Sequence, residues 1–187
     1  TEEETDILLN TMVSDTDGTI DETAMTKLTN SLADTATGEL SATALAATDS
    51  SNAAKIAVAV LASSVEKSGE KKELSLESVP LTSTSGISEL IKKVADGSGT
   101  KSSDLTLNLS KNDKLEKVDS LANVSLQAIT LENNTSVKEV KLDATTNVKE
   151  IDASGATGLT SLDLASNDKI QTLNISKTNV SELNAAG

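Results

Sequence analysis

The feature that most constrains this sequence is a repeat of eleven residues running through its second half. Every step between units is 11 residues except the last, which is 10. The fourth position of each unit is always Leu, Ile or Val: Leu107, Val118, Ile129, Val140, Ile151, Leu162, Leu173 and Leu183. One unit of this length cannot bury its own apolar edge. Neighbouring units are therefore expected to stack into a solenoid.

Each unit combines a strand pattern with a turn pattern. Apolar residues at the fourth and sixth positions alternate with polar ones, which is typical of a short strand with one buried face. The Ser, Asn, Asp, Thr and Gly residues that follow predict a turn. The ninth position is often Asn, whose side chain can bond backbone groups left free at a corner: Asn112, Asn123, Asn134 and Asn167.

The units resemble leucine-rich repeats. Leu159–Asn167 matches the signature L-x-x-L-x-L-x-x-N at every defined position, and Leu126–Asn134 matches if Ile is accepted. The resemblance is to the short coils of bacterial surface proteins of the internalin-like type. It implies coils of about 22 residues, each built from two units, in a right-handed leucine-rich-repeat β-solenoid. A parallel β-helix is the alternative fold.

Two units depart from the repeat pattern. Asp104 stands where the first apolar residue of its unit is expected. The unit that begins at Val148 carries Ala153, Gly155 and Gly158 where bulk and Asn are expected.

The segment before the repeats predicts a first coil with a helical return. Residues 73–81 alternate like a strand until Pro80, and Leu74 lies three units of 11 before Leu107. Residues 86–97 show helical apolar spacing, and Gly97 suits the C-terminal cap. We therefore expect strand, helix and strand over 73–109.

The predicted fold class is α+β in three parts. Residues 1–66 form an α-helical N-terminal domain or cap, with helices near 3–13, 21–33, 41–48 and 51–65. Residues 67–103 form a strand–helix linker or first coil, and 104–187 form the solenoid. No comparable cap follows Val180, so the open end predicts a longer parent protein, a following domain, or an end-to-end dimer through the uncapped last coil.

The composition narrows the function. The chain contains no Cys, His, Arg, Phe, Trp or Tyr, and its formal net charge is −13. Thiolate and imidazole catalysis are excluded, and we expect no enzyme. The acidity disfavours nucleic acid, and the apolar run 56–62 is too short to insert into a membrane.

One acidic segment resembles the core of an EF-hand or dockerin loop. Asp15, Asp17 and Asp21 occupy ligand positions, but Val13 and Ala24 replace the carboxylates expected at the two ends. The alternative interpretation is an ordinary turn between helices. We expect no cofactor, with calcium at these aspartates as the one hypothesis.

The predicted function is non-catalytic recognition of a protein or glycan partner through the strand face. The outward positions of the clearest units are the candidate partner-binding residues: Lys138, Glu139, Lys141, Lys149, Glu150, Asp152, Thr160, Ser161 and Asp163. Lysines and carboxylates among them are also expected to pair across stacked coils. The alternatives are a structural stalk or spacer, and a calcium-dependent dockerin-like module at the N-terminus. The resemblance implies an extracellular or cell-surface location on a bacterium.

Overall fold

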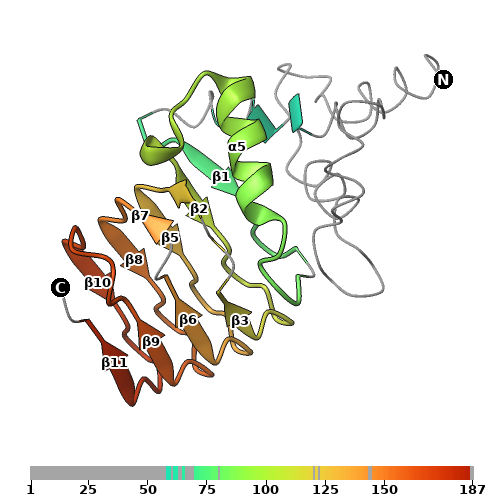
Figure 1. Cartoon of the computed structure of the whole chain (residues 1–187). Coiled ribbons are helices and arrows are strands. Elements are labelled where there is room, and N and C mark those ends of the chain that lie inside the picture. Colours follow the sequence, from blue (N-terminus) through green and yellow to red (C-terminus); the bar gives the residue numbers. More distant parts are fainter. Residues whose placement is uncertain are drawn as a thin grey trace.

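The computed structural model describes residues 58, 59, 61, 62, 65, 70–79, 81–119, 121, 123–142 and 145–185. Within them the chain forms a parallel β-solenoid of about 3 turns, with α5 near its start (Figure 1). The elements are β1 (Glu73–Ser75), α5 (Ile87–Ser98), the 3-10 helix η2 (Ser102–Asp104), β2 (Thr106–Asn108), β3 (Lys117–Val118), β4 (Val124–Ser125), β5 (Ala128–Thr130), β6 (Glu139–Lys141), β7 (Thr145–Thr146), β8 (Glu150–Asp152), β9 (Ser161–Asp163), β10 (Thr172–Asn174) and β11 (Glu182–Asn184).

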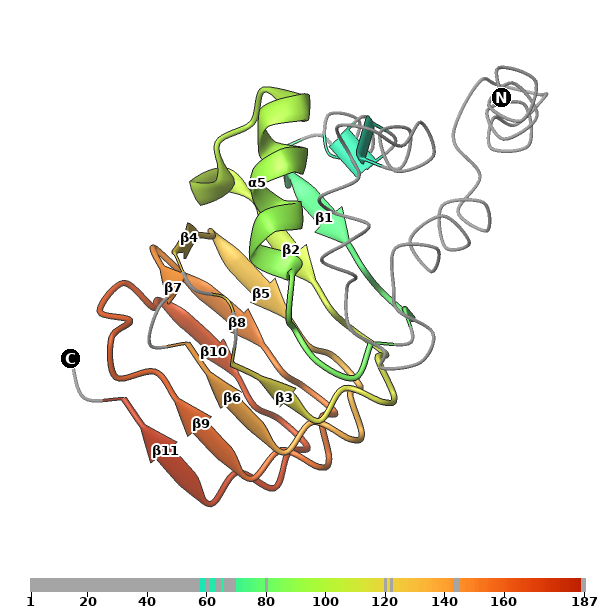
Figure 2. The same cartoon turned by 45° about the vertical axis from the view of Figure 1, so that its right-hand side comes forward.

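The strands form two main parallel sheets. The five-stranded sheet has the order β1-β2-β5-β8-β10, and the four-stranded sheet has the order β11-β9-β6-β3. A small two-stranded sheet pairs β4 with β7. In Figure 2 the strands of the two main sheets follow one another in two rows along the solenoid. Alternate 11-residue units therefore belong to different sheets.

The register confirms the predicted coil of two units. Leu107 pairs with Ile129, and Ile129 pairs with Ile151, so each step along the five-stranded sheet is 22 residues. β1 also pairs with β2, with Leu74 opposite Leu107. The first coil is longer by one unit because α5 forms part of its return path. The predicted strand, helix and strand over 73–109 are thus confirmed.

α5 ends later than predicted. The helix continues through Gly97 to Ser98, and Gly99 is the C-cap with φ of 65°. Glycine adopts this left-handed conformation without a Cβ penalty. Gly97 lies inside the helix, where a Cβ would come 3.2 Å from the Cβ of Ala62. Gly97 therefore allows close packing between segments, and its prediction as the cap was wrong.

The predicted N-terminal helices lie largely outside the described residues. Val58, Ala59, Leu61, Ala62 and Val65, from the predicted helix 51–65, have helical backbone. Leu61 and Val65 are buried in the same apolar cluster as α5 and the strands. At these described positions, side chains from before β1 therefore contribute to the apolar core.

The two departures from the repeat have steric explanations. Leu105, directly after η2, is fully buried and supplies the apolar side chain that Asp104 lacks. In the other unit, Ala153 is fully buried, and a Cβ on Gly158 would lie 2.4 Å from the carbonyl oxygen of Thr135. Small residues occur there because adjacent coils approach closely.

Asparagines join the coils at one corner, as expected from the ninth position. Asn112 Nδ2 donates to the carbonyl oxygens of Leu76 at 3.0 Å and Leu109 at 2.7 Å. Asn134 Nδ2 donates to Leu109 at 2.9 Å, and its Oδ1 accepts from the Asn112 amide at 2.6 Å. Both side chains are fully buried. They satisfy backbone groups that the turns leave unpaired.

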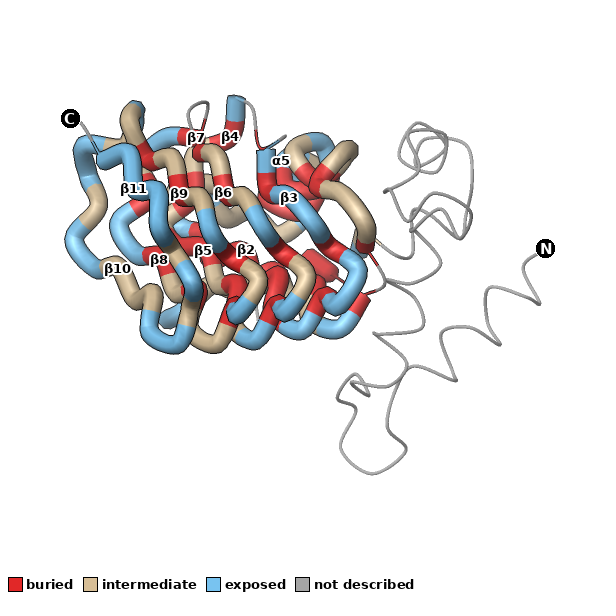
Figure 3. The backbone as a smooth tube through the Cα atoms, turned by 90° about the horizontal axis from the view of Figure 1, so that it is seen from below, coloured by how far each residue is buried: buried red, intermediate tan, exposed pale blue. Residues whose placement is uncertain are grey.

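Burial decreases toward the last coil. Figure 3 shows exposed and half-buried backbone around β10 and β11, and buried positions along the earlier coils. Leu162 is 1% exposed, whereas Leu183, which pairs with it, is 50% exposed. Within the described residues, the strands β10 and β11 are the edges of their sheets on this side.

Candidate partner-binding site

The outward side chains of each sheet form columns that follow the register. In the five-stranded sheet one column contains Glu73, Thr106, Ala128, Glu150 and Thr172. A second column, two residues further along each strand, contains Ser75, Asn108, Thr130, Asp152 and Asn174. Residues 22 apart therefore lie together, whereas residues 11 apart lie on different sheets.

The nine predicted partner-binding residues are divided between these two faces. All nine are exposed or half-buried. Glu150 and Asp152 lie on β8 in the five-stranded sheet, with Lys149 next to them. The other six lie on or beside β6 and β9 in the four-stranded sheet: Lys138, Glu139, Lys141, Thr160, Ser161 and Asp163. The structure does not bring the nine residues together into one row.

Charges on the four-stranded side pair between coils. Lys117 Nζ lies 3.3 Å from Glu139 Oε2, and Lys138 Nζ lies 3.4 Å from Glu116 Oε2. This confirms the expected cross-coil pairing for Lys138 and Glu139. Exposed pairs of this kind contribute roughly 0–1 kcal/mol each to stability.

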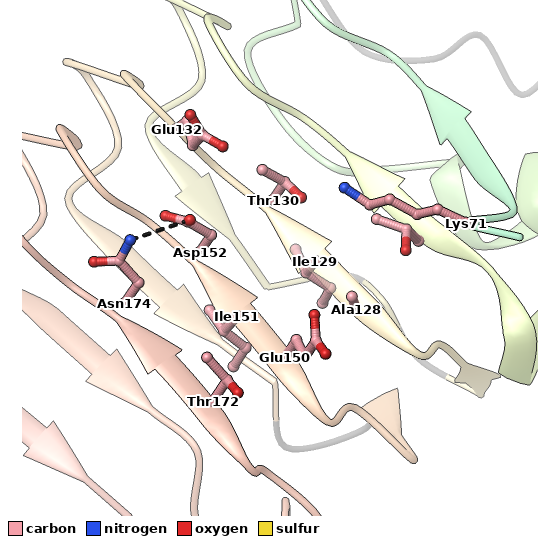
Figure 4. A pocket seen from close by; sticks show the side chains of 11 residues that line it. Lys71, Ala128, Ile129, Thr130, Glu132, Glu150, Ile151, Asp152, Thr172 and Asn174 are labelled. Carbon is pink, nitrogen blue, oxygen red and sulfur yellow. Dashed lines mark hydrogen bonds between the residues drawn. The ribbon is translucent and has the colours of Figure 1, made fainter. Parts of the chain in front are cut away.

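The five-stranded sheet carries a shallow hollow of about 150 Å³ on its outer face (Figure 4). Ala128 lies between Thr106 and Glu150 in its column, and its small side chain leaves the depression. The lining residues come from β2, β5, β8 and β10 and from two flanking positions: Lys71, Thr106, Ala128, Ile129, Thr130, Glu132, Glu150, Ile151, Asp152, Thr172 and Asn174.

Most of these lining residues were missed in the sequence analysis. Only Glu150 and Asp152 were among the predicted partner-binding residues. The available signal was the column of positions 22 apart, in which Thr106, Ala128 and Thr172 are small and uncharged. A comparison of residues 11 apart does not reveal this column, because residues 11 apart lie on different sheets.

Asp152 is held ionised at the edge of the hollow. Burial opposes its charge, but hydrogen bonds from Ser154 and Asn174 and the charge of Lys71 outweigh that effect and lower the pKa of Asp152. The amide of Ser154 donates to Oδ1 at 2.9 Å, and Asn174 Nδ2 donates to Oδ2 at 3.1 Å. Lys71 itself lies 3.4 Å from Glu73.

Neither a metal site nor a membrane span is found among the described residues. They contain no group of three His, Cys, Asp or Glu residues suited to a metal ion. The predicted calcium ligands Asp15, Asp17 and Asp21 lie outside the described residues. No helix in the described part of the chain is long and apolar enough to cross a bilayer.

Comparison with protein-family models, curated proteins and solved structures finds no match to this chain. The repeat architecture and the hollow are therefore the features of the molecule that bear on its function.

Proposed function

We propose that this protein is a non-catalytic recognition solenoid that binds a protein or glycan partner on the outer face of its five-stranded sheet. The hollow over Ala128 is the observation that carries the proposal. A rigid array of stacked strands supports it, which favours binding because little conformational entropy is lost on association. The composition also supports a non-catalytic role, because the chain has neither His nor Cys to act as base or nucleophile.

More specifically, we propose that this protein is a bacterial cell-surface protein of the leucine-rich-repeat type. This proposal is supported by the repeat signature in Leu159–Asn167 and by the 22-residue coil. A parallel β-helix is the alternative, and the strands in both halves of each coil support it. Either architecture presents the same five-stranded face to a partner.

A structural stalk is the second candidate function. The cross-coil ion pairs of the four-stranded side support it, because two lysines and two glutamates of neighbouring coils pair with each other there. A dockerin-like calcium module at Asp15, Asp17 and Asp21 remains a prediction outside the described residues. Calorimetric titration of the metal-free protein with calcium tests it. Heat release that disappears in the triple Asp→Asn variant would support it, and absence of heat would exclude it.

The proposed end-to-end dimer is tested by sedimentation equilibrium. Exposed Leu183 on the edge strand β11 supports association at this end. We expect self-association that weakens in Leu183→Asp. A monomer at all concentrations would refute the dimer.

Glycan and peptide arrays test recognition itself, using the wild-type chain and two variants. Ala128→Gln fills the hollow, and Ser161→Gln places the same side chain on the four-stranded sheet. Signals lost only in Ala128→Gln would support the proposed face. Signals unchanged in both variants, or absent from wild type, would favour the stalk.

A further inference from the structure

The hollow on the five-stranded sheet is lined by more carboxylates than ammonium groups. Three carboxylates line it, from Glu132, Glu150 and Asp152, against the single ammonium of Lys71. Lys71 is 3.4 Å from Glu73, so its charge is already shared with a carboxylate outside the lining. The hollow therefore carries an excess of negative charge on a chain whose net charge is −13.

Three carboxylates elsewhere on the solenoid, those of Glu77, Glu116 and Glu139, form ion pairs with lysines of neighbouring coils. Glu77 lies 2.6 Å from Lys111, and Glu139 lies 3.3 Å from Lys117. Within the described residues Glu150 has no lysine within 4.0 Å, although Lys149 is its neighbour in sequence. Glu132 lies at the rim, where its charge helps to raise the pKa of Lys111, after the larger effect of Glu77.

A second observation concerns the wall of the hollow. Thr106 is only 4% exposed and lines it. Within the described residues its hydroxyl has no hydrogen bond to another protein group, and its oxygen is not enclosed like the buried, unpartnered Oδ1 atoms of Asn112 and Asn167. Its oxygen is thus an acceptor available to a group that enters the hollow.

These acceptors match a cation that donates several hydrogen bonds. A lysine ammonium has three donors and a guanidinium has five, and neither has an acceptor. Asp152 presents a carboxylate already oriented by Ser154 and Asn174. The chain has no aromatic side chain on which a sugar ring could stack. The carboxylate and hydroxyl acceptors of the hollow therefore favour a basic protein segment over a glycan.

Resting on the proposed function, we infer that the hollow receives a lysine or arginine side chain of a partner protein, with Glu150, Asp152 and Thr106 as its acceptors. The negative charge of the whole chain would speed association with a basic partner.

The probe is a fluorescent, capped octapeptide of alternating lysine and threonine, with an otherwise identical peptide carrying acetyl-lysine as the neutral control. Two double variants remove the same charge from opposite faces. Glu150→Gln/Asp152→Asn acts on the five-stranded sheet, and Glu139→Gln/Asp163→Asn acts on the four-stranded sheet. Fluorescence polarisation gives affinities, and thermal melts followed by circular dichroism verify that each variant folds.

We expect Glu150→Gln/Asp152→Asn to weaken binding at least about tenfold and the other double variant to change it by less than about twofold. Ala128→Gln, which removes no charge, should also weaken binding. Amide shifts in NMR spectra of wild type should centre on Ala128 and Thr130. Equal weakening in both double variants would mean general attraction to an acidic chain, and would overturn the inference.

The outcomes separate this inference from the proposed function. If the lysine peptide fails to bind but an array glycan loses binding in Ala128→Gln, the cationic inference is wrong and recognition by this face stands. If neither the lysine peptide nor any array ligand depends on Ala128, both fail.

Discussion

Replacing Asn134 by alanine should be among the most destabilising single changes in the solenoid. Its side chain is fully buried and makes three hydrogen bonds. Nδ2 donates to Leu109 O at 2.9 Å and Leu131 O at 3.0 Å, and Oδ1 accepts from the Asn112 amide at 2.6 Å. Alanine would leave the Asn112 amide unpaired inside the protein and would remove one of the two hydrogen bonds that each carbonyl accepts, since Leu109 O keeps Asn112 Nδ2 and Leu131 O keeps the backbone amide of residue 134. The unpaired amide costs roughly 1–3 kcal/mol and each lost hydrogen bond roughly 0.5–1.5 kcal/mol, so the expected total is about 3–5 kcal/mol.

Asn167 provides a matched comparison at the same position of another unit. It is half-buried, and its Nδ2 donates one bond, to Leu142 O at 2.7 Å. Its Oδ1 has no partner within the described residues. Asn167→Ala should therefore cost only about 1–1.5 kcal/mol. Both variants are measured by urea unfolding followed by circular dichroism, because the chain has neither Trp nor Tyr for fluorescence.

The variant Asn134→Asp separates hydrogen bonding from side-chain volume. A carboxylate there would be buried against two carbonyl oxygens, so its folded pKa should lie above the unfolded value of about 3.9. Because the folded pKa is raised, the stability of Asn134→Asp relative to wild type is greatest below the unfolded pKa. This relative stability is lost as the pH rises through the folded pKa. Asn134→Asp should therefore recover toward wild type as the pH is lowered, and Asn134→Ala should not. Equal losses in Asn134→Ala and Asn167→Ala, or no pH-dependent recovery in Asn134→Asp, would refute the reasoning.

Three further predictions follow from local geometry. Gly158→Ala should cost about 1–3 kcal/mol, because its Cβ would lie 2.4 Å from a backbone oxygen, and the loss should exceed that of Gly99→Ala, which has no atom within 4 Å of its Cβ and only the penalty of a positive φ. Unfolding of the two variants in urea compares them, and a smaller loss in Gly158→Ala would contradict the prediction. Leu162→Ala should cost about 2–5 kcal/mol, whereas Leu183→Ala should cost less than about 1 kcal/mol because half of its side chain is exposed. Similar melting temperatures for these two would show that the last coil is as well packed as the one before it. The lowered pKa of Asp152 stabilises the fold above the pKa of its unfolded state, so stability should fall as the pH drops through the folded pKa, and less so in Asp152→Asn; identical pH profiles would refute this.

The coil itself was predictable from sequence, because the fourth position of every unit is apolar and is buried from Leu107 to Leu162. Leu107, Ile129 and Ile151 stack at 22-residue steps, as the paired units indicated. The helix α5 before β2 was also predictable, because its apolar residues are spaced so that they lie on one side of a helix. Its end was not, because both Gly97 and Gly99 suit a C-cap, and the structure distinguishes them by the positive φ of Gly99.

The candidate site was predictable only in part. Sequence alternation identified Glu150 and Asp152 as outward residues, but it equally predicted Glu139 and Asp163, which lie on the other sheet, as partner-binding residues. Which outward residues share a face depends on how many units make one turn and on where each coil bends. Those are properties of packing between residues 22 apart, and they are not encoded in any single unit. The hollow itself depends on one small residue, Ala128, between the larger Thr106 and Glu150. These three residues are neighbours only in the folded sheet, so the sequence alone does not show the hollow.

The two faces of the solenoid differ in a way that bears on its function. Glu139 on the four-stranded sheet meets Lys117 of the neighbouring coil, so a partner would have to displace an existing ion pair there. Glu150 on the five-stranded sheet has no such pair within the described residues, and Ala128 beside it leaves room for an incoming group. The proposed cationic partner over Ala128 would meet Glu150 without first breaking an ion pair of that residue. This difference is the physical reason to seek recognition on the five-stranded face and a spacer role on the four-stranded one.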